Sequence, residues 1–197
     1  MQKQNNTHFF IAVPIDEYNK EIIHKWILFN KEDLPFKSWV HPEDYHITLA
    51  FLGHVEETEK LEKLKLILHE TTSVYSPFLL NLNGIDTFGK QEHPRILWIS
   101  LEESAALADL QQKVYNVCKD IGIHLDSKPF RPHITIARKW ISEDNFIKPI
   151  DYEEHFTKST KNSLYVEQIN LYQTHLNRAP KYEVKVNFPF LNKEKWG

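Results

Sequence analysis

The chain has 197 residues, enough for one medium-sized domain or two small lobes, and 41% of them are hydrophobic, so a sizeable core can form. The 24 Lys and Arg residues are balanced by 27 Asp and Glu residues, for a net charge of −3. This balance excludes a strongly basic protein that attracts nucleic acid or anionic membranes as a whole. Any recognition of phosphate must therefore be local.

The number of cysteines and the first residues of the chain indicate the cellular compartment in which we expect the protein. The single cysteine, Cys118, cannot form a disulfide within the chain, which fits a reducing compartment. The first residues carry one lysine and only a short apolar run before Pro14, so neither a signal peptide nor a membrane span is predicted. We expect a soluble, cytoplasmic protein without membrane contact, and a monomer.

Hydrophobic periodicity predicts five elements in the first half of the chain. An apolar run over Phe9–Pro14 indicates a strand, and helical spacing over Glu17–Phe29 indicates a helix after it. The alternating segment His46–Leu52 indicates a second strand. Apolar residues on one face of Glu56–His69 indicate a second helix, and Phe78–Ile85 resumes a strand pattern.

The second half begins with the same order of elements. Strands are predicted over Ile96–Leu101 and Pro132–Ala137, on either side of an amphipathic helix over Ser104–Ile121. A weaker helix is expected around Ser142–Phe156. The order strand, helix, strand, helix thus occurs twice, which indicates an internal repeat.

Two more strands are predicted near the end of the chain, over Leu164–Tyr172 with imperfect alternation and over Tyr182–Phe188 in strict period two. We place the first repeat at about 8–86, the second at about 95–173 and a closing strand at about 181–188. These elements predict an α+β fold of two similar lobes, each an antiparallel sheet with helices outside, related by an approximate two-fold. Residues 1–197 then form one bilobal domain with a groove between the lobes.

Two segments of the repeat carry the same polar pattern. Residues 46–51 read His-Ile-Thr-Leu-Ala-Phe, and residues 133–138 read His-Ile-Thr-Ile-Ala-Arg. On a strand, residues i and i+2 share a face, so the histidine and the threonine of each segment point the same way. An approximate two-fold would bring both pairs to one groove. The four residues concerned are His46, Thr48, His133 and Thr135.

This set of side chains suits cleavage of a phosphoester. Such a reaction needs one proton removed from the attacking oxygen and one delivered to the departing oxygen, while charge gathers on the other phosphate oxygens. Histidine can take either proton role near neutral pH, and hydroxyls can donate to the phosphate. A single His-x-Thr is more often an ordinary sheet histidine, but two copies at matching points of a repeat favour a site. The residues alone do not distinguish acid from base.

Other side chains near the motifs could bind a substrate. Arg138 ends the second motif strand and Arg131 precedes His133 by two positions, so either could contact a phosphate, and a surface ion pair is an equal alternative. Trp39 and Phe130 could stack on a base, although core packing is the stronger interpretation for both. No cysteine pair or His-Glu-x-x-His pattern is present, so neither a metal site nor a cofactor is predicted.

With these motifs the chain resembles the 2H phosphoesterase superfamily, specifically the RNA 2′,3′-cyclic phosphodiesterases, also called 2′-5′ RNA ligases. The resemblance covers nearly the whole chain. It rests on residues 9–13 (Phe-Phe-Ile-Ala-Val), on Trp39-Val, on residues 46–53, which end in Phe-Leu-Gly, and on residues 131–138. Residues 171–182 match the family's closing segment less well, since a Gly before the Pro and a Ser at position 174 are commoner there.

The resemblance implies metal-independent hydrolysis of a terminal ribose 2′,3′-cyclic phosphate to a 2′-phosphomonoester, on RNA 3′ ends or small nucleotides. It implies that His46 protonates the leaving 3′-oxygen, that His133 activates water, and that Thr48 and Thr135 hold the phosphate. Phe51, from the longer first motif, joins the candidate substrate-binding residues. Run in reverse, the same acid and base would join RNA ends through a 2′-5′ linkage.

Two alternatives stay open on the sequence alone. The groove could bind RNA ends or small cyclic phosphates without turning them over. A related enzyme acting on internal 2′-5′ linkages, or on a cyclic phosphate that is not RNA, would share the same catalytic residues.

Overall fold

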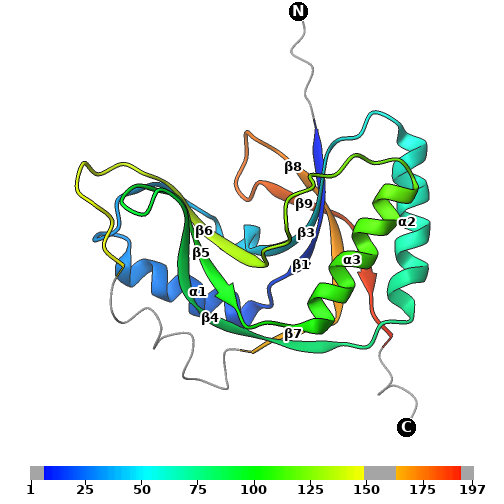
Figure 1. The fold of residues 1–197 in the computed structure, drawn as a ribbon, viewed down its shortest axis with the longest axis horizontal. Helices are drawn as coiled ribbons and strands as arrows, with labels where there is room; N and C mark the ends of the chain where they lie inside the picture. The colour runs from blue at the N-terminus through cyan, green and yellow to red at the C-terminus, as the bar shows by residue number, and fades with distance from the viewer. Residues whose placement is uncertain (1–6, 149–162, 192–197) are drawn as a thin grey trace, which may run out of the picture.

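A computed structural model of the chain describes residues 7–148 and 163–191 as an α+β fold (Figure 1). Within these residues it has nine strands, three α-helices and one short 3-10 helix. In chain order the elements are β1 (His8–Pro14), α1 (Glu17–Asn30), β2 (Phe36–Trp39), η1 (Pro42–Asp44), β3 (His46–His54), α2 (Thr58–Ser73), β4 (Phe78–Gly89), β5 (Pro94–Leu101), α3 (Ala105–Asp120), β6 (His133–Trp140), β7 (Ser163–Val166), β8 (Gln168–Thr174) and β9 (Tyr182–Pro189).

The strands pair in the order β7-β4-β5-β6-β3-β1-β8-β9, with β2 added to β6, and the pairs are antiparallel. The motif strands β3 and β6 are neighbours that meet at one residue pair, Ile47 opposite Ile134. From this pair outward, β3-β1-β8 mirrors β6-β5-β4. The predicted α+β class, antiparallel pairing and approximate two-fold are therefore confirmed.

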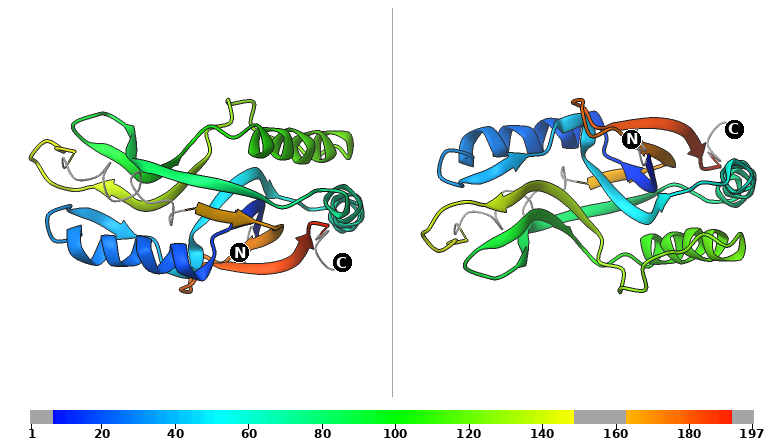
Figure 2. Two further views of the ribbon diagram at one scale, coloured as in Figure 1. Left: turned by 90° about the horizontal axis from the view of Figure 1, so that it is seen from below. Right: turned by 90° about the horizontal axis from the view of Figure 1, so that it is seen from above.

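The helices divide between the two ends of the molecule. Helices α2 and α3 lie side by side at one end, whereas α1 lies at the other (Figures 1 and 2). Helix α3 covers the buried face of β3, where the Gln111 side-chain amide donates to the Leu49 carbonyl at 3.3 Å. None of the helices in the described parts of the chain is long and apolar enough to cross a bilayer.

Local sequence explains how α1 begins and where it is attached. The Asp16 carboxylate caps the helix by accepting from the Asn19 backbone N–H at 2.8 Å. The buried Asn19 amide also donates to the Ser163 carbonyl of β7 at 3.2 Å. The cap therefore ties the first helix to a strand much later in the chain.

The predicted strand over Leu164–Tyr172 is wrong as a single element. The chain forms β7 up to Val166, which pairs with β4, and then β8 from Gln168, which pairs with β1. Exposed Glu167 lies at the break, so the imperfect alternation marks a change of partner. This segment carries the chain from one half of the sheet to the other.

The helix predicted around Ser142–Phe156 is absent from its described part, residues 142–148, and its remainder lies outside the described residues. Local and tertiary bonds replace helical ones there. The Ser142 hydroxyl accepts from the Asp144 N–H at 3.1 Å, and the Phe146 N–H donates to the Glu92 carbonyl at 2.7 Å. The Phe146 ring packs edge-on against Trp140, so tertiary contact overrides a weak helical pattern.

The junction of the two halves should be sensitive to cavity formation. Ile47 and Ile134 are both 0% exposed. We expect Ile134→Ala to lower the free energy of unfolding by about 2–5 kcal/mol, because the deleted methyl groups leave a cavity. Urea unfolding followed by tryptophan fluorescence measures this. The control Leu79→Ala, at a side chain 61% exposed on β4, should change it by less than about 0.5 kcal/mol; equal losses would contradict the argument.

Candidate active site

The two His-x-Thr motifs place their polar side chains on one face of the sheet. On both strands the intervening isoleucine is fully buried, while the histidine and threonine beside it are only partly buried. We call this surface the motif face, defined by His46, Thr48, His133 and Thr135. Because β3 and β6 are antiparallel about the Ile47–Ile134 pair, the four side chains gather around the centre of the sheet.

Each motif strand contains an extra residue directly after its threonine. Ile11 and Ala12 of β1 are consecutive but pair with Ala50 and Thr48, which leaves Leu49 as a bulge in β3. In line with this, two successive residues of β3 are buried. Strict alternation would direct Phe51 away from Thr48, and the bulge returns it to the motif face.

The second motif repeats this irregularity at the matching position. Leu97 and Trp98 of β5 pair with Ala137 and Thr135, so Ile136 is the extra residue of β6. Arg138 is thereby returned to the motif face, five positions after the histidine. Period-two reasoning from the sequence did not foresee either bulge.

Both histidines are anchored in the same way. The ring Nδ1 of His46 lies 2.7 Å from the Asp44 carbonyl oxygen, and that of His133 lies 2.6 Å from the Arg131 carbonyl oxygen. A carbonyl oxygen can only accept, so the neutral imidazole carries its proton on Nδ1. Each Nε2 therefore keeps a lone pair and can take up or return a proton.

Aromatic rings enclose His46. Its ring centroid lies 4.8 Å from that of Phe10, 5.1 Å from Tyr182 and 6.1 Å from Tyr172. Loss of water lowers the pKa of His46 to about 4, against the hydrogen bond from its ring to Asp44, which raises it. The imidazole is therefore neutral at neutral pH.

The pKa of His133 is also lowered, chiefly because burial removes water from the ring. Its neighbours are Phe88 at 4.9 Å and Trp98 at 5.6 Å between ring centroids. These two rings stack on each other at 4.7 Å. The shift is smaller than that of His46, which has more aromatic neighbours.

Arg138 adds positive charge to the same place. It is exposed on β6, between Ile96 of β5 and Ser38 of β2. Its charge lowers the pKa of both His46 and His133, so the guanidinium acts on both halves of the site. A site with one fixed cation and two neutral imidazoles favours an anionic ligand.

The remaining candidates differ in what they offer a ligand. The hydroxyls of Thr48 and Thr135 have no hydrogen-bond partner within residues 7–148 and 163–191 and are free to donate. Phe51 is 54% exposed, and among the described aromatic residues only His8 packs against its ring, at 5.8 Å between centroids. More than half of the side chain is therefore available to a ligand.

Trp39, Phe130 and Arg131 are placed differently. Trp39 and Phe130 pack against the hydrophobic core, and the Trp39 ring meets Phe36 at 5.9 Å. Their rings are less available than that of Phe51. Arg131 is exposed and contributes its backbone carbonyl to His133.

Six residues around the two histidines were not among the predicted site residues: Phe10, Asp44, Phe88, Trp98, Tyr172 and Tyr182. Asp44 lies two residues before His46, whereas the five aromatic residues reach the histidines through strand pairing, which no local pattern reveals. The alternation of β9 could have shown that Tyr182 is near a sheet face, but not which face.

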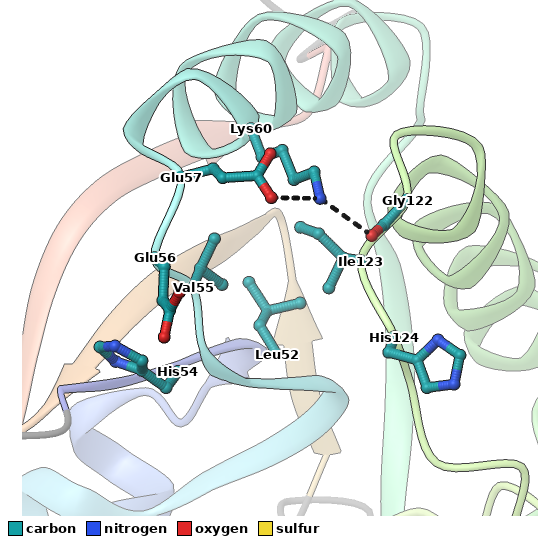
Figure 3. Close-up of a pocket in the computed structure, with 9 residues that line it drawn as sticks. All are labelled: Leu52, His54, Val55, Glu56, Glu57, Lys60, Gly122, Ile123 and His124. Carbon is teal, nitrogen blue, oxygen red and sulfur yellow. Dashed lines mark hydrogen bonds and ion pairs between the residues drawn. The ribbon is translucent and has the colours of Figure 1, made fainter.

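A pocket of about 330 Å³ lies elsewhere, where β3 ends, α2 begins and α3 ends (Figure 3). Its floor is apolar, and at its edge the Lys60 ammonium pairs with Glu57 at 2.9 Å. None of the four motif residues lines it. The lining residues are Leu52, His54, Val55, Glu56, Glu57, Lys60, Gly122, Ile123 and His124. Neither here nor elsewhere in the described residues do three His, Cys, Asp or Glu side chains form a metal-binding group.

Curated relatives match most of the chain. It is 43% identical over 185 residues to an RNA 2′,3′-cyclic phosphodiesterase of Geobacillus stearothermophilus, covering 94% of this chain and 58% of the relative. It is 38% identical over 176 residues to an RNA 2′,3′-cyclic phosphodiesterase of Bacillus subtilis, covering 89% of this chain and 92% of that one. The chain thus spans less than two thirds of the first relative and nearly all of the second.

Solved structures share the fold. E. coli LigT complexed with 3′-AMP superposes with a TM-score of 0.77 at 21% identity, covering 94% of this chain and 99% of LigT. TT0787 of Thermus thermophilus superposes with a TM-score of 0.74 at 22% identity, over 94% and 99%. The family model described as the 2′-5′ RNA ligase superfamily matches residues 32–178, which include both motifs. The chain belongs to the 2′-5′ RNA ligase superfamily.

Proposed function

We propose that this protein is an RNA 2′,3′-cyclic phosphodiesterase that hydrolyses a terminal 2′,3′-cyclic phosphate to a 2′-phosphomonoester without a metal ion. The observation that carries the proposal is the pair of Nδ1-anchored histidines on one face, with Arg138 acting on both. The names of the Geobacillus and Bacillus relatives support the substrate class. A LigT structure holds 3′-AMP, a nucleotide of the size that the terminal residue of RNA would present.

In the proposed reaction a water molecule attacks phosphorus while the bond between phosphorus and the 3′-oxygen breaks. The Nε2 of His133 accepts the water proton, and a protonated Nε2 of His46 donates to the departing 3′-oxygen. The product carries a 3′-hydroxyl and a 2′-phosphate. The hydroxyls of Thr48 and Thr135 donate to the non-bridging oxygens, where charge gathers, and Arg138 balances it.

The acid role of His46 requires help from the substrate. In the free protein its pKa is about 4, and the charges of Arg138 and His133 both disfavour its protonation. A bound phosphate diester is an anion, so it offsets these charges and raises the pKa of both imidazoles. The substrate thereby promotes the protonation that its own cleavage needs.

Recognition beyond the phosphate is proposed to be limited to the terminal nucleotide or two. Phe51 offers an open ring on the motif face for stacking on a base. The net charge of −3 does not favour a long electrostatic track for RNA. The proposed substrates are RNA 3′ ends and small cyclic nucleotides. The protein is proposed to be a cytoplasmic monomer. Joining of RNA ends through a 2′-5′ linkage would be the reverse of the same reaction.

Product regiochemistry tests the activity directly. We expect a 2′-phosphomonoester from a nucleoside 2′,3′-cyclic phosphate in the presence of EDTA, followed by phosphorus NMR. His46→Ala and His133→Ala should each lower kcat by about 10²–10⁴-fold, because each removes one proton transfer. His69→Ala, at an exposed position of α2, is the matched control and should retain activity. Binding without turnover, or full activity in either motif variant, would refute the proposal.

A substrate with a better leaving group distinguishes the general acid from the general base. A p-nitrophenyl phosphodiester departs without needing a proton, so removal of the general acid should matter less for it. We expect His46→Ala to lose much less activity on this substrate than on the cyclic nucleotide, whereas His133→Ala loses similar activity on both. The opposite pattern would exchange the two roles.

The pH dependence should differ between the free and the bound enzyme. Burial holds the pKa of both histidines below the ordinary value of about 6.5, so the acid-base pair needs a lower pH in the free protein. Bound phosphate raises both values. We therefore expect the optimum of kcat/KM, which reports the free enzyme, at a lower pH than the optimum of kcat. Coincident optima would show that the substrate charge does not act on the histidines.

The two arginines near the second motif provide a matched comparison. Arg138→Gln should lower kcat/KM by about 10–100-fold, because it removes a charge-assisted contact to the phosphate. Arg131→Gln should have a much smaller effect, because Arg131 is exposed and contacts His133 through its backbone carbonyl, which the substitution keeps. Steady-state kinetics on one cyclic nucleotide decides, and equal losses would contradict the placement of Arg138.

A further inference from the structure

The start of β9 is attached to the segment that holds His46. Asp44 is only 4% exposed, and its carboxylate accepts from the backbone N–H groups of Lys181 and Tyr182, both at 2.9 Å. The backbone carbonyl of the same residue accepts from Nδ1 of His46 at 2.7 Å. One aspartate therefore links the last strand to the first motif histidine.

Tyr182, the first residue of β9, packs against His46 and Phe10. Its ring stands edge-on to His46, with centroids 5.1 Å apart at 89°, and to Phe10 at 4.8 Å and 79°. Burial raises the pKa of the Tyr182 phenol, whereas the charge and hydrogen bonding of Arg138 act to lower it. Arg138, carried by β6, therefore acts on the Tyr182 phenol.

The second motif lacks such an attachment among the described residues. His133 has the same bond from Nδ1 to a backbone carbonyl, but that carbonyl belongs to exposed Arg131. Its ring contacts are Trp98 from the neighbouring strand β5 and Phe88 from β4, one strand further along the sheet. The clamp formed by Asp44 and Tyr182 is therefore a feature of the His46 half.

We propose that Asp44 and Tyr182 are positioning residues of the active site. Asp44 fixes the start of β9 against His46. The ring of Tyr182 holds the imidazole of His46 in place and excludes water from it. The use of this clamp in catalysis rests on the proposed function, whereas its effect on His46 does not.

The arrangement argues for a task beyond stability. A buried carboxylate needs hydrogen bonds, and both of the backbone donors to Asp44 come from the residues that place the Tyr182 ring. Among the described residues, the charged and titratable groups that act on or contact His46 are Asp44 from η1, His133 and Arg138 from β6, Tyr172 from β8 and Tyr182 from β9. Shortening Tyr182 leaves the other four in place and admits water to the imidazole.

The first test separates the ring from the hydroxyl. An NMR titration of the His46 ring proton, assigned with His46→Gln, is run on Tyr182→Phe and Tyr182→Leu. We expect Tyr182→Leu to raise the His46 midpoint by about one pH unit or more, because water returns, and Tyr182→Phe to leave it nearly unchanged. Tyr165→Phe and Tyr165→Leu, at an exposed tyrosine of β7, are the matched controls and should not move it.

Steady-state kinetics tests the ring. Tyr182→Leu should lower both kcat and the separation between the kcat and kcat/KM optima, whereas Tyr182→Phe should keep both. An unchanged separation in Tyr182→Leu would overturn the role of the ring.

Asp44→Asn tests the attachment of β9. The amide keeps one accepting oxygen but turns a donor toward the other N–H, so we expect the start of β9 to loosen and kcat to fall. Loss of the Asp44 charge by itself lowers the His46 pKa, so kcat is the readout for this variant. Glu43→Gln, the exposed neighbour paired with Lys20, is the control. If Asp44→Asn does not fold, Tyr182→Leu decides alone. An unchanged His46 midpoint in Tyr182→Leu together with an unchanged kcat in folded Asp44→Asn would overturn the proposal, whereas a shifted midpoint in Tyr182→Leu without turnover of any cyclic phosphate would refute only the proposed function.

Discussion

The pairing of Ile47 with Ile134 is the constraint on which the rest of the structure depends. Both side chains are fully buried, so both strands must present their neighbouring residues to the opposite face. Because each isoleucine stands between a histidine and a threonine, the same contact that closes the core also gathers the polar groups. Core formation and site assembly are therefore one event, and a change at this pair affects both.

Symmetry in the backbone does not produce symmetry in the chemistry. Both strands carry a bulge after the threonine, and both histidines give Nδ1 to a backbone carbonyl. The bulges, however, return an open aromatic ring, Phe51, to the motif face on one side and a cation, Arg138, on the other. Three aromatic rings surround His46 and two contact His133, and burial lowers the pKa of His46 to about 4. Two near-identical motifs can thus take different proton roles.

Segments far from the motifs in sequence supply this difference. Helix α3 covers the buried face of β3, and β8 and β9 bring tyrosines to the first motif. The clamp through Asp44 joins positions more than one hundred residues apart in the chain. The site therefore forms only when the strands of both halves have paired into one sheet.

The sequence by itself determined the class of fold, most strands and helices, and the four motif residues, because period and residue type are local properties. It could not determine the break at Glu167 or the irregular segment after Trp140, where pairing partners and a packed Phe146 override the local pattern. Only the tertiary structure decided that Arg138 and Phe51 share the motif face and that Asp44 and Tyr182 contact His46. Bulges, desolvation and bonds across the sheet create these features, and all three exist only once distant strands have paired.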